Sequence, residues 1–404
     1  MDGTPHPAPV KRRFVAYLSG FDPQGPPHYH QLFREQAALQ AQVNGWGIEV
    51  GPRKKSGDTI AWWSVVGHEA QTPTEVRYEF LRWDDIVRAH WPRSRWGLYK
   101  ATAWASWQMW RNGVMWRTLT RSWPMGVAIG LPGLLMLALT ALASALAAAL
   151  AAWAAHGQPL GALVGALVTG LLLVVLARWA EARSHMAWLM RSLACLVRQG
   201  RDQTPELEAR LDAHAAHLAG VASSGDHDEV VVVGHSSGAM MAAIALSRAL
   251  PLLPGGKPVA SLGLLTLGHC SPLLSLQPEA QRYREELQRL CNDGRVHWVD
   301  AAAPPDGCSF PLVDPTEGLP LATDAARPQL VNPKFAQAFG PERYQEIRRD
   351  KFRCHFQYLM AGERPTAFDL FSLVAGARSF RERTRSLGSV RDFQQFRLRK
   401  VPRT

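Results

Sequence analysis

Residues 228–241 read DEVVVVGHSSGAMM. The four consecutive valines predict a strand that is buried on both faces, because β-branched side chains suit a pleated surface covered from both sides. We expect the strand to end at Gly234, and a helical apolar pattern then runs from Ala239 to Leu250, just before Pro251. The segment therefore predicts a strand, a tight turn and a helix in direct succession.

The turn carries the pattern G-x-S-x-G, with Gly234, Ser236 and Gly238 at its fixed positions. Between a strand and a helix this pattern is typical of a nucleophile elbow, where the backbone bends too sharply to leave room for side chains beside the serine. Ser236 would lie at the tip of the turn, and the N–H of Ser237 would point toward a developing oxyanion. The alternative is a glycine-rich turn without chemistry.

The elbow resembles that of the α/β-hydrolase superfamily, and the resemblance implies the chain order nucleophile, acid, histidine. Three histidines follow Ser236: His269, His297 and His355. The first two lie in or beside expected strands, too early to follow a loop that bears the acid. His355 is therefore predicted as the general base, and the alternative is a histidine with a purely structural role.

The acid is expected in the loop that follows the strand at residues 295–299, because loops at the carboxyl ends of sheet strands converge on such a site. Asp306 lies there in a Pro-Pro-Asp-Gly turn, similar to the proline-flanked aspartate of lipase-like members of the superfamily. Asp300 is the first alternative and Asp314 the second, while an ordinary turn aspartate remains a competing interpretation. The acid would orient the imidazole and stabilise its charged form.

A second oxyanion donor is expected after the early strand at residues 14–18. The resemblance places it at the backbone N–H of Gly20 or Phe21, on position alone, because the chain lacks an HGGG motif at this point. A simple strand-to-helix connection is the alternative. His28 and His30 lie nearby without a convincing third ligand, so the sequence predicts neither a metal nor a cofactor.

A long apolar segment interrupts the chain. No Asp, Glu, Lys or Arg occurs from Ser122 to Ala177, and Gly157-Gln158-Pro159 divides this segment into helices at about 125–155 and 160–179. Each reaches the ~20 residues needed to cross a hydrocarbon core. We expect two membrane spans joined by a tight turn, and a hairpin buried inside a soluble protein is the alternative.

Flanking charge predicts the orientation of the hairpin. Arginines precede the first span and follow the second, whereas the connecting turn carries only His156. The positive-inside bias then puts both termini and the hydrolase-like domain in the cytoplasm, at the inner membrane if the protein is bacterial. Gly161 and Gly165 form a GxxxG motif that would bring together either the two helices or two protomers in a homodimer.

Aromatic and basic residues are concentrated just before the first span. Seven of the 15 tryptophans lie within residues 91–123, among five arginines. Amphipathic rings beside cations suit the headgroup layer, so residues 93–123 are expected to form an interfacial segment, with some of the tryptophans covering the core instead.

Composition narrows the class of protein. The net charge of +11 could indicate nucleic acid or an anionic membrane as a partner, but no nucleic-acid motif occurs, so we expect no nucleic-acid binding. The five cysteines are scattered and odd in number, which favours a reducing compartment over a disulfide framework. No apolar signal segment is expected near residue 1.

We therefore expect an α/β fold with a mostly parallel sheet and flanking helices, formed by the residues before and after the hairpin. The expected segments are an N-terminal part of the domain (1–92), the interfacial segment (93–123), the two spans (124–180), a C-terminal part with the triad (181–374) and a basic tail that is solvated or contacts anionic lipid (375–404).

The predicted function is hydrolysis of an ester or thioester, with a lipid or other acyl compound as the favoured substrate. The alternative is an inactive hydrolase-like module that tethers a partner at the membrane. A transporter is disfavoured, because the spans contain no ionisable residue other than the histidine of the turn.

Overall fold

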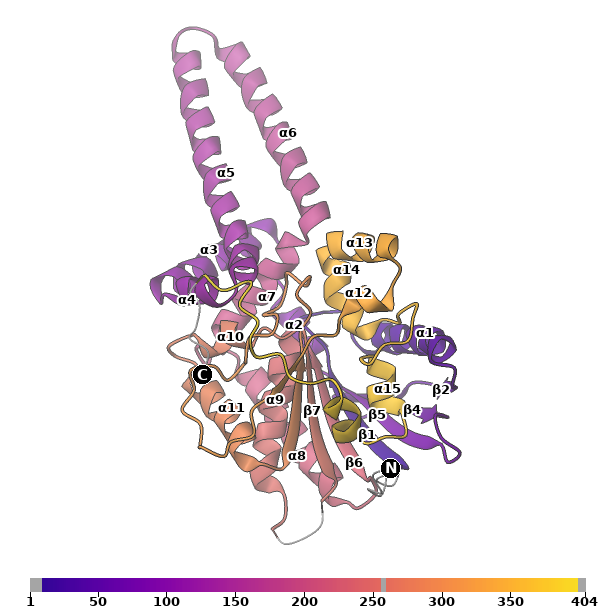
Figure 1. Ribbon diagram of the computed structural model, residues 1–404. Coiled ribbons are helices and arrows are strands. Elements are labelled where there is room, and N and C mark those ends of the chain that lie inside the picture. Colours follow the sequence, from indigo (N-terminus) through magenta and orange to yellow (C-terminus); the bar gives the residue numbers. More distant parts are fainter. Residues whose placement is uncertain (1–8, 256–258, 399–404) are drawn as a thin grey trace.

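The computed structural model describes residues 9–255 and 259–398, and it has three layers with two long helices that project from one end (Figure 1). The strands are β1 (Arg12–Leu18), β2 (Ile48–Val50), β3 (Lys54–Ser56), β4 (Ile60–Gly67), β5 (Thr74–Leu81), β6 (Glu229–His235), β7 (Ser261–Leu267), β8 (Val296–Ala301) and β9 (Gln329–Val331).

The helices before β6 are α1 (Pro26–Asn44), α2 (Asp84–Ala89), α3 (Arg95–Arg111), α4 (Val114–Arg121), α5 (Trp123–Ala155), α6 (Pro159–Ser184), α7 (Met186–Gln199) and α8 (Pro205–Ser223). The helices after β6 are α9 (Ser237–Ala249), α10 (Ser271–Ser275), α11 (Gln281–Asp293), α12 (Phe335–Ala338), α13 (Pro341–Arg349), α14 (Lys351–Phe356), α15 (Leu370–Ala375) and α16 (Phe380–Arg385).

The sheet is mixed but mostly parallel. Its order is β2-β4-β5-β1-β6-β7-β8-β9, and β3 pairs with β4. The neighbouring strands β5, β1, β6, β7, β8 and β9 run parallel. Strands β2, β3 and β4 form an antiparallel edge next to β5. The expected α/β fold with a mostly parallel sheet is confirmed.

The residues before and after the projecting helices share this sheet. β1 pairs in parallel with β6, so that Phe14 lies opposite Val230 and Leu18 lies opposite Gly234. The ends of β1 and β6 therefore lie side by side, which places the loop after β1 next to the turn after β6.

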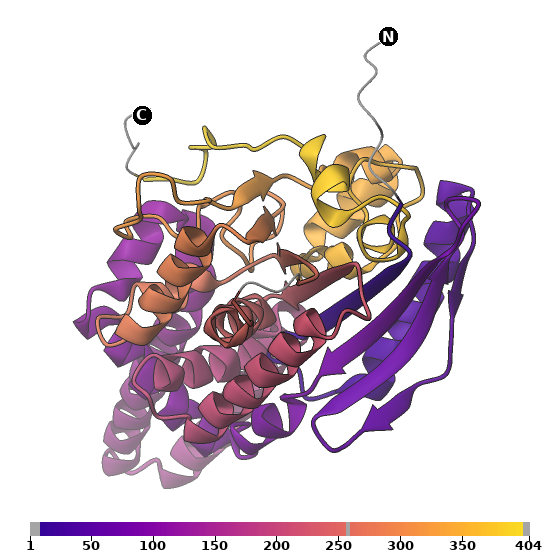
Figure 2. The same ribbon diagram turned by 90° about the horizontal axis from the view of Figure 1, so that it is seen from below.

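The valine run of β6 is covered on both faces, as its composition predicts. Val230 and Val232 belong to the core under α8 and α9, whereas Val231 and Val233 belong to the core on the opposite face. All four side chains are essentially inaccessible to solvent. Figure 2 shows the helices on both sides of the sheet.

At residues 375–384 the C-terminal segment packs on the domain and is not the solvated tail that was expected, whereas residues 385–398 are exposed or half-buried. Phe380 and Thr384 of α16 are buried. The buried guanidinium of Arg13 donates to Glu229 at 2.7 Å and to the carbonyls of Gly376 and Arg378 at 2.8 and 2.7 Å. Buried polar groups therefore fix the segment to the core of the sheet; the rest of the predicted tail, residues 399–404, lies outside the described residues.

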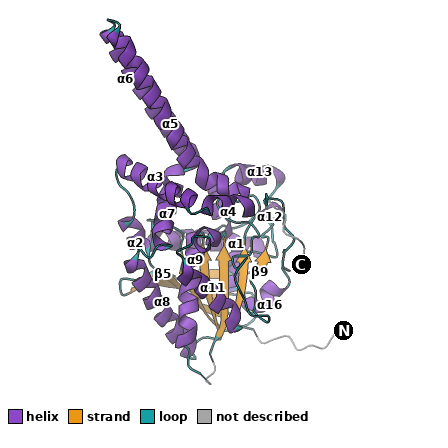
Figure 3. Cartoon of the chain, turned by 90° about the vertical axis from the view of Figure 1, so that its left-hand side faces the viewer, coloured by secondary structure: helices purple, strands orange, loops and turns teal. Residues whose placement is uncertain are grey.

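α5 and α6 form an antiparallel pair (Figure 1), and the pair projects from the domain (Figure 3). By length and composition, α5 is the one helix among the described residues that could cross a membrane, and the apolar stretch of α6 is described over Pro159–Val175. A Cβ at Gly161 would meet the Trp153 ring at 2.9 Å, and one at Gly165 would meet Leu150 at 2.7 Å. The GxxxG motif thus faces α5 of the same chain. The side chains of residues 176–177 and 179–184, Arg183 of the predicted flank among them, lie outside the described residues.

The tryptophans near the base of α5 divide into two groups. Trp91 and Trp104 pack against the core. The others are at least 43% exposed, on α3, α4 and the start of α5: Trp96, Trp107, Trp110, Trp116 and Trp123. A set of exposed amphipathic rings therefore lies on the helices next to the point where α5 leaves the domain, in the segment predicted to be interfacial.

Candidate active site

The turn after β6 has the backbone of a strained elbow. Ser236 has φ 58° and ψ −125°, a conformation that L-residues rarely adopt. Such strain costs about 1–3 kcal/mol and persists only where the surrounding structure enforces it. A Cβ at Gly234 would lie 2.3 Å from the carbonyl oxygen of Gly238, and one at Gly238 would lie 2.2 Å from that of Leu18. Both glycines are therefore required by close backbone contacts.

His355 and Asp306 are in direct contact. The imidazole Nδ1 of His355 lies 2.9 Å from Oδ2 and 3.1 Å from Oδ1 of Asp306, and both side chains are fully buried. Oδ1 also accepts the N–H of Cys308 at 2.9 Å, and Oδ2 accepts the hydroxyl of Tyr358 at 3.0 Å. Burial alone would raise the pKa of Asp306, but the interaction with His355, together with hydrogen bonds from Cys308 and Ser309, holds the pKa below its usual value. The carboxylate is thus ionised and keeps the proton of His355 on Nδ1.

The other ring nitrogen of His355, Nε2, is buried and has no hydrogen-bond partner within residues 9–255 and 259–398. Likewise, no hydrogen bond joins Ser236 to His355 in the described part of the chain; the serine hydroxyl contacts the thiol of Cys270 instead. Burial raises the pKa of this thiol to about 12, so it is neutral and cannot act as the base. An imidazole with Nδ1 held by a carboxylate and Nε2 unoccupied is equipped to accept a proton at Nε2.

The loop after β1 lies against the elbow. A Cβ at Gly20 would lie 3.1 Å from the Cβ of Ser236 and 3.5 Å from its hydroxyl oxygen. The side chain of Phe21 stacks on Trp91, and its carbonyl oxygen accepts the indole N–H of Trp188 at 2.6 Å. On the other side, Ser237 is the first residue of α9, and amides of a first helical turn have no acceptor within the helix. The predicted oxyanion residues therefore flank Ser236 from two segments.

The alternative acids have other partners. Asp300 accepts the hydroxyl of Thr266 at 2.6 Å and lies 3.4 Å from Nε2 of His269. Burial raises the pKa of Asp300 to about 6. Asp314 pairs with Arg391 at 3.3 Å. Of the three candidate acids, the structure brings only Asp306 to His355.

Sequence reasoning missed three neighbours of the site. His235 precedes the serine inside the motif, and its ring lies 4.7 Å from that of His355 between centroids. Tyr358 lies three residues after His355, a spacing that could have suggested a contact. Cys270 follows β7 at the same edge of the sheet as Ser236. Apart from that position, nothing in the sequence indicated that Cys270 lies at the site.

A cavity of about 960 Å³ opens beside the loop that carries Asp306. The loop residues Pro304, Pro305, Gly307 and Cys308 line it, together with residues of α13 and α14. Its far wall is the first three turns of α5. The cavity therefore connects the loop of the candidate acid with the base of the projecting helix.

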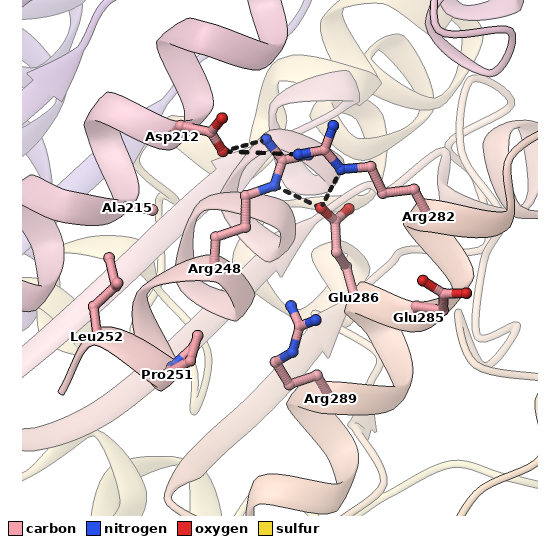
Figure 4. A pocket seen from close by; sticks show the side chains of 9 residues that line it. All are labelled: Asp212, Ala215, Arg248, Pro251, Leu252, Arg282, Glu285, Glu286 and Arg289. Atoms are coloured by element: carbon pink, nitrogen blue, oxygen red, sulfur yellow. Dashed lines mark hydrogen bonds and ion pairs between the residues drawn. The ribbon is translucent and has the colours of Figure 1, made fainter. Parts of the chain in front are cut away.

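A second cavity, of about 470 Å³, lies between α8, α9 and α11 (Figure 4). It lies at the end of α9 opposite Ser236, and its central guanidinium, Arg248, is paired with Glu208, Asp212 and Glu286. Because these carboxylates already neutralise the arginine, the network is a structural link between three helices.

Comparison with known protein families, with curated proteins and with solved structures finds no match to this chain. The geometry of the site therefore carries the functional assignment by itself.

Proposed function

We propose that this protein is a membrane-anchored serine hydrolase of the α/β-hydrolase type that cleaves an ester or thioester. The contact between His355 and Asp306, with Nε2 of His355 unoccupied beside the elbow, is the observation that carries the proposal. The strained backbone of Ser236 supports it independently, because such strain is typical of an elbow nucleophile.

In the proposed reaction, the hydroxyl oxygen of Ser236 attacks the acyl carbon while Nε2 of His355 takes its proton. The negative oxygen of the tetrahedral intermediate is stabilised by the N–H groups of Ser237 and of the Gly20–Phe21 loop. His355 then gives the proton to the leaving alcohol or thiol as the bond to the acyl carbon breaks. Water, deprotonated by His355, releases the acid and restores the serine.

The attack requires a short rearrangement, because the serine hydroxyl contacts Cys270 at rest. For the attack, the Ser236 hydroxyl would have to leave the thiol and form a hydrogen bond with Nε2 of His355. Catalytic hydrogen bonds are often long or misaligned without substrate and tighten when it binds. The resting contact is therefore compatible with the proposed chemistry.

Membrane attachment is the second part of the proposal. α5 is apolar over 33 residues, and exposed tryptophans lie at its start and on the adjacent helices α3 and α4. We extend the anchor to both helices, with both termini and the catalytic domain on the cytoplasmic side. An ester or acyl lipid would then meet the domain at the membrane surface, and α5 or α6 would be the contact for any homodimer.

Hydrolysis of p-nitrophenyl esters of graded acyl length by the detergent-solubilised protein tests the proposal. The wild type should turn over at least one ester, and Ser236→Ala should not. Ser224→Ala, in an exposed turn after α8, serves as the matched control and should leave the rate unchanged. A folded wild type that hydrolyses no ester or thioester would contradict the proposal.

One observation favours a second function. The absence of a hydrogen bond between Ser236 and His355, noted above for the described residues, would also fit an inactive module that tethers a partner at the membrane. The same assay separates the two functions, because only the hydrolase turns over an ester.

A further inference from the structure

The cavity beside the Asp306 loop is built from the base of the membrane helix and from the catalytic half of the chain. Val127, Ala128 and Leu131 of α5 form one wall. The opposite wall consists of the loop around Asp306 and of α14, the helix that bears His355. At about 960 Å³ it lies near the top of the usual range for ligand sites, about 300–1,000 Å³.

The wall on α5 is apolar and unoccupied by the rest of the protein. Met125 and Ile129 are buried against the domain, whereas Val127 and Leu131, on the other side of the same turns, are 46% and 44% exposed. Beyond these turns α5 projects away from the domain (Figure 1). The cavity therefore opens where the membrane helix leaves the domain, which in the proposed orientation is the depth of the lipid headgroups.

The rim of the cavity on α13 and α14 is cationic. Arg348, Arg349 and Lys351 line it, all three are exposed, and none of them makes an ion pair with a described residue. The two carboxylates on the same rim are engaged: Glu346 pairs with Arg343 at 2.6 Å, and Asp350 accepts the N–H of Arg353 at 2.9 Å. Unpaired positive charge beside an apolar wall complements an acyl chain with an anionic headgroup.

The cationic rim is tied to the candidate catalytic groups. The amine of Lys351 donates to the carbonyl of Pro305 at 3.4 Å, one residue before Asp306. The ring of Phe352 packs edge-on against Trp188 at 5.4 Å, and Trp188 donates to the oxyanion loop through Phe21. A ligand on the rim therefore lies beside the segments that hold the acid, the base and the oxyanion loop.

We infer that this cavity binds a membrane phospholipid with a net negative headgroup and delivers it as substrate. The phosphate lies on Arg348, Arg349 and Lys351, and an acyl chain lies along Val127 and Leu131. The inference rests on the proposed hydrolase function and names its substrate class. Zwitterionic lipids of the same chain length bind less well, because the three cations without an ion pair on the rim outnumber its one such carboxylate, Asp350.

Photo-crosslinking in phosphatidylcholine nanodiscs tests the inference without turnover. Ser236→Ala protein receives a phosphatidylglycerol or a phosphatidylcholine probe, each with the same diazirine-bearing acyl chain, and labelled peptides are mapped by mass spectrometry. The phosphatidylglycerol probe should label residues 127–131, 304–308 and 346–352 several-fold more than the phosphatidylcholine probe. Equal labelling by the two probes, or labelling of the projecting helices alone, would overturn the inference.

Charge variants sharpen the test. Arg348→Gln/Arg349→Gln should lower phosphatidylglycerol labelling by roughly fivefold for each arginine, the usual effect of one basic side chain at an anionic lipid surface. Arg348→Lys/Arg349→Lys should retain the labelling, and so should the control Arg34→Gln/Lys55→Gln, which removes two exposed cations from α1 and β3. Loss of labelling in the lysine variant or in the control would contradict the assignment of the rim.

Two further outcomes separate the possible failures. If inorganic phosphate binds the rim while neither lipid probe labels it, the rim binds free phosphate and the lipid assignment fails. If the wild type hydrolyses soluble esters while labelling does not depend on headgroup charge, the hydrolase function is supported and the proposed substrate class is wrong. If labelling depends on headgroup charge but no ester is cleaved, the proposed hydrolase function is wrong.

Discussion

Nε2 of His235 lies 2.8 Å from the backbone carbonyl oxygen of His355. Because a carbonyl only accepts, His235 donates from Nε2, and its Nδ1 has no partner in the part of the chain that the structure describes. The residue before the candidate nucleophile thus holds the backbone of the candidate base. His235 is a positioning residue that couples the elbow to α14.

This contact predicts a pH-dependent stability. Burial lowers the pKa of His235 to about 3, and the nearby His355 contributes to the shift. The unfolded chain, with a histidine pKa of about 6.5, takes up the proton first as the pH falls, so stability is lost progressively from about pH 6.5 toward pH 3. At pH 5 the loss from this group amounts to about 2 kcal/mol.

His235→Gln removes the titration but keeps an N–H for the His355 carbonyl. Thermal unfolding of the variant should therefore depend less on pH between 7 and 5 than that of the wild type. His68→Gln, which replaces an exposed histidine beside Glu49, is the control and should follow the wild type. A His235→Gln curve parallel to that of the wild type would show that His235 is not held neutral.

Asp306→Asn should abolish most activity while leaving the fold intact. The amide can donate a hydrogen bond where the carboxylate only accepts, so it favours the wrong tautomer of His355, and such a loss is about 10⁴-fold in kcat. Ester hydrolysis measures the effect, and circular dichroism checks the fold. Asp300→Asn, the matched change at the other candidate acid that is buried, should cost far less activity. Equal losses in the two variants would contradict the assignment of Asp306 as the acid.

Gly20→Ala tests the oxyanion loop. The added methyl would lie 3.1 Å from the Cβ of Ser236 and 3.5 Å from its hydroxyl, so the loop must shift away from the elbow. Displacing one oxyanion donor costs about 10²–10³ in kcat, and we expect a loss of that order with little change in KM. Gly220→Ala on α8, where a Cβ meets nothing within 4 Å, is the control and should leave kcat unchanged. If Gly20→Ala kept the wild-type kcat, the oxyanion donor would not lie in this loop.

Arg13→Met should destabilise the domain by about 3–5 kcal/mol, because it leaves the carboxylate of Glu229 buried without its partner. Arg13→Met/Glu229→Gln should recover part of the loss, since a neutral amide can still accept the N–H of Phe380. Urea unfolding measures both. Arg12→Met, one residue away and exposed, is the control. A comparable loss of unfolding free energy in this control would show that the buried pair of Arg13 and Glu229 is not the cause of the destabilisation.

The sequence predicted those parts of the fold and site that follow from local pattern. Four valines between polar flanks predicted the buried strand, and the glycine spacing predicted the turn, because both depend on residues next to one another. Chain order then selected His355 and favoured Asp306, which the structure brings together. The oxyanion loop was placed by position, and β1 does end beside β6.

Other features depend on contacts between distant segments and had no local signal. The guanidinium of Arg13 meets Gly376 across 363 positions, so the basic C-terminal segment looked like a solvated tail. Cys270 meets Ser236 only because β7 follows β6 in the sheet. Likewise, the cationic rim forms a cavity only together with α5, which lies more than 200 residues earlier in the chain.

The most direct measurement is the reaction of the folded, detergent-solubilised protein with a fluorophosphonate probe, followed by mapping of the modified residue by mass spectrometry. The wild type and Ser237→Ala should carry the phosphonyl group on Ser236, and Ser236→Ala should not react. His355→Ala should react far more slowly, because no base activates the hydroxyl. A folded wild type that stays unmodified at Ser236 would contradict the account.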